Sequence, residues 1–489
     1  MIAAITSVGA ALRLHRLGAQ SFWTDESLTA WISSTPWSVF IATVTQREAN
    51  MSVYFLLARW WMVLGDSEAF LRLPSALASI ATVPLLYLLA RQMFSERVAI
   101  GSAALVAVHS GALRYAQEAR GYSMLVLLVV LSWIFLLRVM ERPSFGNCVV
   151  YVVVSVLGVY THFFGALGLL AQATALLAVR DERTPWRKLL GCAGAIAILL
   201  LPIAYFVISR DVGQIGWAAL MRRHALARTI SALFGIAPGN YRTPMGLATL
   251  AAYTAALSLS AIAWIRAARE WGREFLMYTL AWAGLTVPLL VAVGVSLAKD
   301  VLIPRYLSEC APFAVMLVAA GVGYFDRRRA GAVAIAALIG IGLFWDATYF
   351  ASVRKDDWRG ATAFVVANSK AGDALAIYHP LNLAGFEYYR RHLAVDQTRP
   401  QVIYPDEHSC PTIGNEGSWE ASEVRNRASL FDAIDAIDVD HPRLWVLLTT
   451  VPLGSVNAEL ETAIEHHLAK RFHTKSETQF KGIKVWLYG

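Results

Sequence analysis

Residues 121–137 read GYSMLVLLVVLSWIFLL and contain no charged side chain. A helix needs about 20 apolar residues to cross a hydrocarbon core of about 30 Å, and this run comes close to that length. Comparable apolar runs occupy residues 71–91, 98–113, 147–161, 163–179, 188–208, 244–265, 275–297, 304–325 and 330–348. Together with a shorter apolar stretch at residues 1–12, they predict a polytopic α-helical membrane protein with about 11 transmembrane helices.

The composition supports this class and excludes others. Hydrophobic residues make up 57% of the 489 positions and charged residues only 16%, whereas soluble domains carry about 25% charged residues. The 16 Trp, 18 Tyr and 21 Phe exclude a disordered chain. Four cysteines spread over so long a chain exclude a disulfide scaffold; they are Cys148, Cys192, Cys310 and Cys410. The first apolar stretch runs into Arg13 and Arg16 without a basic start or a small-residue cleavage site, so we expect no cleavable signal peptide.

Basic residues give the orientation of the chain. The net charge of +8 comes from short Lys and Arg clusters between apolar runs, which is typical of cytoplasmic loops and not of nucleic-acid binding. The clusters occupy every second turn: Arg91 with Arg97, Arg138 with Arg142, Arg180 to Lys188, Arg266 to Arg273, and Arg327 to Arg329. The turns near 109–122, 161–164, 210–243 and 298–305 are then external, as is the C-terminus, while the N-terminus is internal. Loop 210–243 is an exception, because it carries Arg210, Arg222, Arg223, Arg228 and Arg242, and we interpret it as an anion site.

Two segments are not expected to span the membrane. Residues 51–64, MSVYFLLARWWMVL, are short and carry Arg59 beside two tryptophans, which favours a helix lying in the interface. After about residue 350 the apolar runs shorten to GDALAIYHP, PRLWVLLTT and GIKVWLYG, with a helical pattern at 457–472, which indicates a small α/β domain. We therefore predict a transmembrane domain at 1–349, whose first external loop is 13–70, and an extracytoplasmic α/β domain at 350–489.

The first external loop opens with LGAQSFWTDESLTAW, which places Asp25 and Glu26 together beside the membrane. Asp is a good N-cap and Glu a good first-turn residue, so helix capping alone explains the pair. Alternatively, a carboxylate here acts as a general base that takes a proton from an acceptor hydroxyl as it attacks an activated sugar carbon.

The second external turn, ALRYAQEARGYSML, forms a dense polar patch between two apolar runs. Snorkelling and aromatic belts explain many such patches, yet ionisable groups at a membrane boundary are also a functional hypothesis. Arg120 could hold a phosphate with its planar guanidinium, with Tyr122 beside it. Glu118 could orient that arginine or assist the carboxylates of the first loop.

Three further stretches contain candidate residues. His162 lies at an apolar external corner; packing is its commoner role, but with Asp25 and Glu118 it could complete a divalent-cation site. Lys299, Arg305 and Tyr306 in KDVLIPRYL are either interface anchors or a second phosphate clamp. In the C-terminal domain, His379, Glu387 and Tyr388 could touch a substrate, but a strand followed by a helix start is the simpler explanation of that pattern.

Several familiar chemistries find no motif in the sequence. It contains no glycine-rich phosphate loop with Lys, no GxSxG, no HExxH and no paired CxxC. ATP-driven transport is therefore unsupported.

The order of the motifs LGAQSFWTDES, RLPSALASIATVPLLYLLARQMF, YAQEARGYSMLVLL, THFFG, PRYL and KDDWRGATAFV resembles bacterial GT-C glycosyltransferases. It is most similar to the superfamily of protein O-mannosyltransferases and aminoarabinose transferases. The resemblance covers about the first 390 residues and is strongest over the first 180. The short first helix departs from the family pattern, and only some relatives have the external α/β domain.

This resemblance implies the GT-C fold and transfer of a sugar from a polyprenyl-phosphate donor to a lipid, glycan or protein hydroxyl outside the bacterial cytoplasmic membrane. It implies Asp25 as the base, with Glu26 its neighbour, and Glu118 and Arg120 as the acidic and basic positions of the second loop. Arg305 with Tyr306 matches the late arginine near the donor phosphate. The leaving group is already a stabilised phosphate, which leaves the need for a divalent cation open. A transporter of polyprenyl-linked glycans and a non-catalytic glycan-binding protein remain as alternatives.

Overall fold

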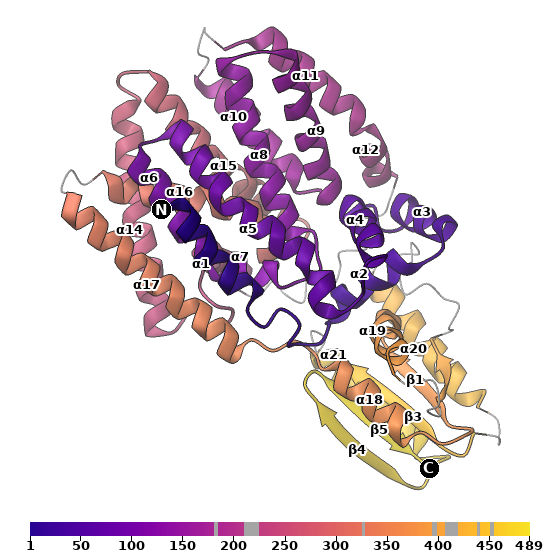
Figure 1. Cartoon of the computed structure of the whole chain (residues 1–489). Helices are drawn as coiled ribbons and strands as arrows, with labels where there is room; N and C mark the ends of the chain where they lie inside the picture. Colours follow the sequence, from indigo (N-terminus) through magenta and orange to yellow (C-terminus); the bar gives the residue numbers. More distant parts are fainter. Residues whose placement is uncertain are drawn as a thin grey trace.

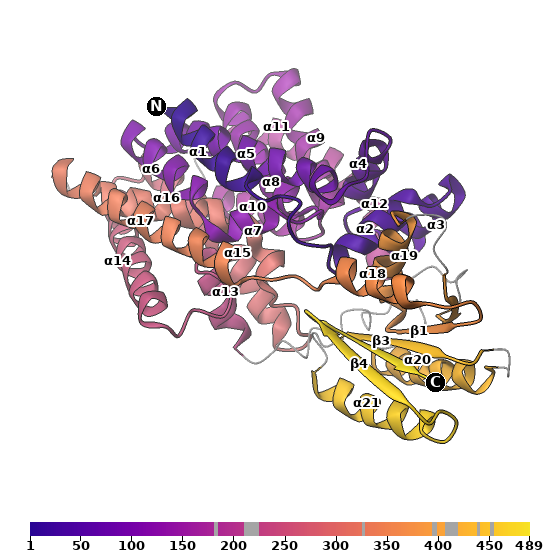
Figure 2. The ribbon, with the colours of Figure 1, turned by 60° about the horizontal axis from the view of Figure 1, so that its bottom comes forward.

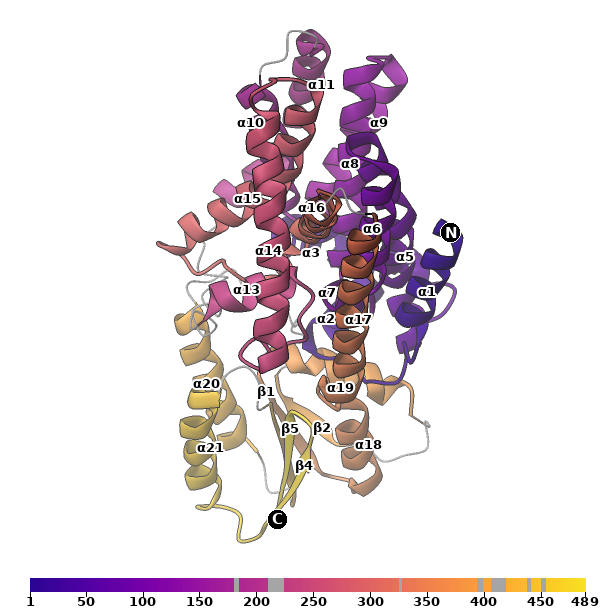
Figure 3. The ribbon, with the colours of Figure 1, turned by 90° about the vertical axis from the view of Figure 1, so that its left-hand side faces the viewer.

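A computed structural model describes residues 1–179, 184–209, 224–324, 328–393, 399–405, 419–437, 441–449 and 454–489. The chain forms a helical body and, below it, a smaller domain with a sheet that contains the C-terminus (Figures 1 and 3). Predictions for Arg180, Arg210, Arg222, Arg223, Arg327 and Cys410 lie outside the described residues.

Each apolar run predicted to cross the membrane is helical. Six helical segments are long and apolar enough to span: α5 (Glu68–Met93), α8 (Tyr122–Glu141), α14 (Pro244–Ala267), α15 (Arg273–Ser296), η2 with α16 (Pro304–Cys310 and Ala311–Gly323) and α17 (Arg328–Ser352). Two bent pairs raise this to eight: α6 with α7 (Glu96–Ala107 and Ser110–Ala116, bent by 54°) and α11 with α12 (Trp186–Leu199 and Leu201–Ile208, bent by 51°). Helices α1 (Ile2–Leu14), α9 (Phe145–Thr161) and α10 (Gly165–Val179) are apolar but shorter. The number of 11 crossings therefore stays a prediction.

Helix α16 lies at the centre of the helical body, where almost every side chain is buried (Figure 3). Its neighbour α14 approaches so closely that a Cβ built on Gly321 would lie 1.9 Å from the carbonyl oxygen of Ala256. Only glycine allows this approach, because any side chain would collide with the backbone of α14. The centre of the helical body thus holds η2, at the start of the same span, in a fixed position.

Three short helices follow α1 and belong to the loop predicted to be the first external one: α2 (Thr24–Ser34), α3 (Trp37–Gln46) and α4 (Ser52–Met62). Trp37 and Trp60 are exposed, and the Arg59 guanidinium lies 4.1 Å from the centre of the Trp37 ring. Exposed aromatic rings beside an arginine suit the headgroup region of a bilayer. At 11 residues, α4 is too short to span, as the sequence predicts. A further short helix, α13 (Ala225–Leu233), packs against η2.

The C-terminal domain is α/β. Its five-stranded sheet has the order β2-β1-β3-β5-β4, in which β1 is parallel to β2 and β3 while β5 is antiparallel to β3 and β4. The strands are β1 (Ala374–Tyr378), β2 (Gln401–Tyr404), β3 (Leu444–Thr449), β4 (Lys475–Phe480) and β5 (Ile483–Tyr488). The helices are α18 (Trp358–Asn368), η3 (Pro380–Asn382), α19 (Leu383–Arg391), α20 (Trp419–Asp435) and α21 (Gly454–Leu468).

This domain is packed on the first external loop. Phe22 is fully buried in one apolar cluster with Trp358 and Phe386, and its backbone N–H donates to the Tyr389 hydroxyl at 2.6 Å. Helix α19 lies against α2, between the helical body and the sheet (Figure 2). The loop that carries Asp25 is therefore held from both sides, by the helical body and by the C-terminal domain.

Candidate active site

Asp25 and Glu26 occupy the first turn of α2, where the helix dipole favours negative charge. The N-cap position is Trp23, and its side chain makes no capping hydrogen bond. The capping role considered for Asp25 is therefore not what the structure shows. The two carboxylates point into different surroundings.

The Asp25 carboxylate forms an ion pair with Arg305. The Arg305 Nη1 donates to Oδ2 at 2.9 Å, and both side chains keep about a fifth of their surface exposed, 24% for Asp25 and 18% for Arg305. The Arg305 guanidinium lies 5.4 Å from the ring centre of Trp23, 5.7 Å from Tyr306 and 6.0 Å from Tyr122. The aromatic rings exclude water from part of the pair while leaving it reachable.

Arg120 approaches the same helix turn from the second external loop. Its Nη1 donates to the Asp25 carbonyl oxygen at 3.4 Å and to the Thr29 hydroxyl at 3.3 Å. Its Nε has no hydrogen-bond partner among the described residues. Burial lowers the pKa of Arg120, but Tyr122 and Asp25 outweigh this and raise it, so the side chain stays charged. Two guanidinium groups from distant parts of the chain thus flank Asp25.

Glu26 lies at the centre of a buried ion network. Arg72 binds it with two hydrogen bonds of 2.7 and 2.9 Å, Lys355 Nζ donates at 2.8 Å, and the backbone N–H of Ala119 donates at 2.8 Å. Burial alone would raise the pKa of Glu26, but Arg72 and Lys355 outweigh it and lower the pKa to about 2. The side chain is fully buried with both oxygens occupied. Glu26 does not fit the predicted catalytic role and instead joins the two external loops to the segment after α17.

Glu118 is also buried, at 3% exposure, and its Oε1 accepts from Arg114 Nε at 3.3 Å. Its carboxylate pairs with Arg114, and among the described residues it has no hydrogen bond or ion pair with the Arg120 guanidinium, so the predicted orienting contact is not formed.

His162 follows α9 and packs among the rings of Tyr122, Tyr306 and Phe164, with centroid distances of 5.0 to 5.7 Å. Its Nδ1 accepts from the backbone N–H of Phe164 at 3.2 Å. Burial lowers the pKa of His162 to about 3, with further contributions from Arg120 and Arg305, so the ring is neutral. The packing role fits this geometry.

The structure does not support the predicted divalent-cation site of Asp25, Glu118 and His162. Within the described ranges, no three His, Cys, Asp or Glu side chains come together as metal ligands. Asp25 pairs with Arg305, Glu118 pairs with Arg114, and His162 is enclosed by aromatic rings. Each of the three is engaged separately.

Of the other residues predicted to bind the donor phosphate, two lie beside Arg305 and one does not. Tyr122 and Tyr306 border the Arg305 guanidinium, as described above. Lys299 is exposed just after α15, and among the described residues its side chain has no hydrogen bond or ion pair with Asp25, Arg120 or Arg305. The site therefore brings together Arg120, Tyr122, Arg305 and Tyr306, but not Lys299.

A small cavity lies between the helices near Arg305, although Asp25, Arg120 and Arg305 do not line it themselves. Its walls are mostly apolar and come from α5, α6, α7, α8, α13 and the start of the η2–α16 span. Tyr122 and Pro304 line it, and these residues also contact or adjoin Arg305. Tyr122 thus lines this mostly apolar space and also borders the Arg305 guanidinium.

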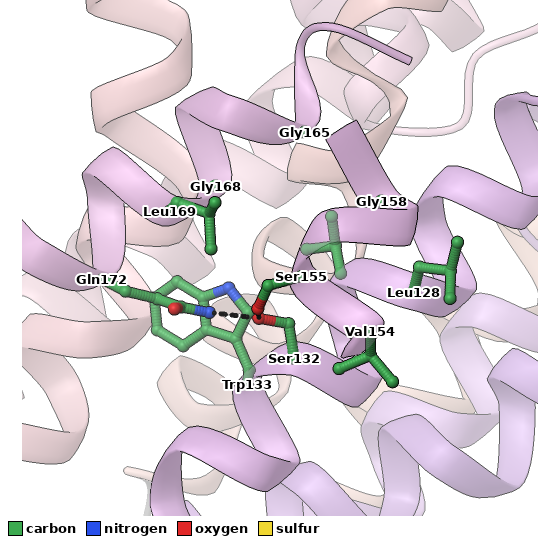
Figure 4. Close-up of a pocket in the computed structure, with 11 residues that line it drawn as sticks. Leu128, Ser132, Trp133, Val154, Ser155, Gly158, Gly165, Gly168, Leu169 and Gln172 are labelled. Atoms are coloured by element: carbon green, nitrogen blue, oxygen red, sulfur yellow. Dashed lines mark hydrogen bonds between the residues drawn. The ribbon is translucent and has the colours of Figure 1, made fainter. Parts of the chain in front are cut away.

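A second, smaller pocket of about 220 Å³ lies between α8, α9 and α10 (Figure 4). Gln172 donates to Ser132 at 3.0 Å, and Ser132 shares a hydrogen bond of 2.9 Å with Ser155. The Tyr151 hydroxyl donates to Gln172 at 2.7 Å. These polar side chains satisfy one another inside the helical body, which is typical of helix association in membranes.

Sequence reasoning missed Arg72 and Lys355. Arg72 is a charged residue near the start of an otherwise apolar run, and this signal could have marked it. Lys355 precedes the C-terminal domain, and nothing in its neighbourhood indicates that it reaches Glu26, 329 residues away.

Comparison with known proteins agrees with this architecture. Residues 49–208 match the family described as dolichyl-phosphate-mannose-protein mannosyltransferase. ArnT from Cupriavidus metallidurans in the apo state is 11% identical, with a TM-score of 0.62 over 99% of this chain and 97% of that one. The chain has the GT-C fold. The resemblance predicted from the motifs is confirmed, and the described residues contain six to eight helical segments long and apolar enough to cross a membrane.

Two further GT-C structures are similar. ArnT from the same organism bound to undecaprenyl phosphate has a TM-score of 0.61 at 11% identity, over 100% of this chain and 97% of that one. The archaeal oligosaccharyltransferase AglB from Archaeoglobus fulgidus, in complex with an inhibitory peptide and a dolichol-phosphate, has a TM-score of 0.54 at 11% identity, over 91% of this chain and 69% of that one. No curated protein sequence matches the chain.

Proposed function

We propose that this GT-C protein transfers a sugar from a polyprenyl-phosphate donor to a lipid, glycan or protein hydroxyl on the outer face of the bacterial cytoplasmic membrane. The observation that carries the proposal is the Asp25–Arg305 pair, which is flanked by Arg120 and borders Tyr122, a residue that also lines a mostly apolar cavity. The similar structures with bound undecaprenyl phosphate and dolichol-phosphate support a lipid-phosphate ligand.

Asp25 is the proposed general base. It takes the proton from the acceptor hydroxyl while that oxygen forms a bond to the anomeric carbon of the sugar. The bond between that carbon and the phosphate oxygen breaks, and the electron pair leaves with polyprenyl phosphate. Arg305 and Arg120 stabilise the negative charge that develops on this leaving group.

The ion pair also gives a way to couple donor binding to activation of the base. Without donor, Arg305 binds the Asp25 carboxylate at 2.9 Å. A donor phosphate offers the same guanidinium a bidentate partner. In this proposal the phosphate takes over Arg305 and leaves the Asp25 carboxylate able to accept a proton.

The apolar cavity is the proposed site for the first isoprene units of the donor. A polyprenyl chain cannot leave the bilayer, so a mostly apolar space beside the arginines places its phosphate where the guanidinium groups can bind it. The sugar and acceptor then meet on the side of Asp25.

The test is single-turnover transfer from a labelled undecaprenyl-phosphate sugar in detergent or nanodiscs. Asp25→Asn keeps the size of the side chain but removes its basicity, and we expect release of undecaprenyl phosphate to fall by at least about 100-fold, in line with the usual contribution of a general base. Donor binding, measured by equilibrium titration, should stay within a few-fold of wild type. Asp66→Asn, in an exposed part of the same loop, is the matched control and should retain activity.

Two results would contradict the proposal. One is transfer by Asp25→Asn at the wild-type rate. The other is movement of intact polyprenyl-linked glycan across proteoliposomes without release of polyprenyl phosphate, which would indicate a transporter.

A further inference from the structure

The parallel strands of the C-terminal sheet end next to α2. In open α/β sheets the loops after the carboxyl ends of the strands form the functional edge. Here the loop after β1 runs through η3 into α19, which packs against α2. The edge of the soluble domain therefore lies against the helix that carries Asp25.

Asn382, at the end of η3, connects three elements at this edge. Its Nδ2 donates to the carbonyl oxygen of Tyr378, at the end of β1, and to the hydroxyl of Thr449, at the end of β3, both at 3.1 Å. Its Oδ1 accepts from the Thr24 hydroxyl at 3.1 Å. The side chain is only 3% exposed, and both its nitrogen and its oxygen take part in these hydrogen bonds. Thr24 is the first residue of α2 and directly precedes Asp25.

The residue before Asn382 reaches the site as well. Leu381 packs against a cluster of buried residues that includes Leu28, Tyr115 and Tyr122, and Tyr306 packs against the same cluster. Tyr122 and Tyr306 border Arg305. Two successive residues of the C-terminal domain thus pack on or bond to elements of the candidate active site.

We propose that Asn382 is a positioning residue of the transfer reaction: it ties the first turn of α2 to the ends of β1 and β3, and so fixes Asp25 relative to the donor clamp. The C-terminal domain is then part of the catalytic machinery and not an appended module. This inference rests on the proposed role of Asp25.

Asparagine suits the task because it offers two donors and an acceptor in one rigid plane. Leucine has the same branched arrangement of four side-chain heavy atoms but is bulkier and has no polar atom, so Asn382→Leu removes all three hydrogen bonds. The Thr24 hydroxyl and the α2 turn are then no longer tied to the sheet. Displacement of a catalytic group by about 1 Å can cost about 100-fold in rate.

The first experiment measures how well the first turn of α2 is protected from hydrogen exchange. Hydrogen exchange of the full-length protein, followed in peptides covering residues 24–34, should be faster in Asn382→Leu and in Thr24→Val than in wild type. Asn368→Ala is the matched control, because the side chain of this exposed asparagine at the end of α18 bonds only within its own helix among the described residues. It should leave exchange of α2 unchanged. Unchanged exchange of α2 in both Asn382→Leu and Thr24→Val overturns the proposal.

The second experiment measures transfer. Asn382→Leu should lower kcat by about ten- to 100-fold with donor Kd close to wild type, measured at a temperature where the variant is folded. Thr24→Val should act in the same direction, and the double variant should lose no more than Asn382→Leu alone, since the bond that Thr24→Val removes is one of the three that Asn382→Leu removes. Losses that multiply, or a wild-type kcat in Asn382→Leu, contradict the positioning role.

The two readouts separate this inference from the proposed function. If wild type shows no transfer but α2 loosens in Asn382→Leu, the structural tie stands and the proposed function fails. If wild type transfers sugar and Asn382→Leu does so equally well with unchanged exchange, the proposed function stands and the role of Asn382 is overturned.

Discussion

Replacing Glu26 by Gln should be the most destabilising single change among the charged residues around the site. Glu26 is fully buried and binds two buried cations, Arg72 and Lys355. The amide of Gln keeps the shape but removes the charge, which leaves the two cations facing each other. Removal of one partner from a buried ion pair costs about 3–5 kcal/mol, or roughly two to four orders of magnitude in the unfolding equilibrium.

The protonation state of Lys355 decides how large the loss of stability in Glu26→Gln is within this range. Burial lowers the pKa of Lys355 to about 8, and Glu26 is the main charge that opposes the loss of its proton. In Glu26→Gln the negative charge that keeps Lys355 protonated is absent. Lys355 can then lose its proton, which leaves Arg72 as the charged member of the former Arg72–Lys355 pair. We expect Glu26→Gln to lose stability near the lower end of the range at pH 9, and to lose more at pH 6, where Lys355 is more readily protonated.

The wild-type protein adds a second test through pH. The pKa of Glu26 is lowered from its ordinary value of 4.5 to about 2, so its contribution is present above pH 4.5 and is lost as pH falls toward 2. Glu26→Gln should lack the part of the acid destabilisation that falls in this window.

The assay is unfolding by sodium dodecyl sulfate in mixed micelles, followed by tryptophan fluorescence. Glu141→Gln is the matched control, because its pair with Arg273 is about half exposed and should contribute at most about 1 kcal/mol. Stability of Glu26→Gln within 1 kcal/mol of wild type at pH 6 would refute the reasoning.

Two further predictions use residues in and near the site. Arg305→Ala should weaken equilibrium donor binding at least about tenfold, as loss of a charge-assisted hydrogen bond implies, whereas Lys299→Ala, which lies apart, should not; equal effects would count against the clamp. A Cβ on Gly165 would lie 2.9 Å from the Gly158 carbonyl carbon and oxygen, whereas one on Gly158 would meet no atom closer than 3.7 Å. Gly165→Ala should therefore lower the unfolding temperature by several degrees and Gly158→Ala leave it nearly unchanged; the reverse order would show that α9 and α10 can separate freely.

The helices of the membrane domain could be predicted because the length and apolar composition of a segment are enough to identify a membrane-spanning helix. The breaks within two of these helical segments could not be predicted. The α6–α7 break at His109 is stabilised by a hydrogen bond from the Ala112 N–H to the His109 ring and by the contact of that ring with the carbonyl of Leu233. Such tertiary partners leave no periodic signal in the sequence.

The C-terminal domain was predicted in class but not in detail. Strands β1, β3 and β5 are apolar runs and were foreseen, as was helix α21. Strand β4, KSETQF, is largely exposed and polar, so its sequence is typical of a loop. It forms a strand because it pairs with β5.

In the site, sequence could indicate which groups are chemically suitable but not which partners they find. Asp25 and Glu26 are neighbours with the same functional group, yet one meets Arg305 and the other meets Arg72 and Lys355. Adjacent helix positions point about 100° apart, so they face different surroundings. Only the packing of α2 against its neighbours decides which carboxylate stays accessible.

The Glu26 network also dictates an order of assembly during synthesis. Arg72 and Ala119 are made early and can bind Glu26 while the later helices are still to be inserted. Lys355 and Asn382 emerge only after the whole helical body has been translated. Until then helix α2 lacks its ties to the segment after α17 and to the C-terminal domain, and both ties form only when Lys355 and Asn382 fold back onto Thr24 and Glu26.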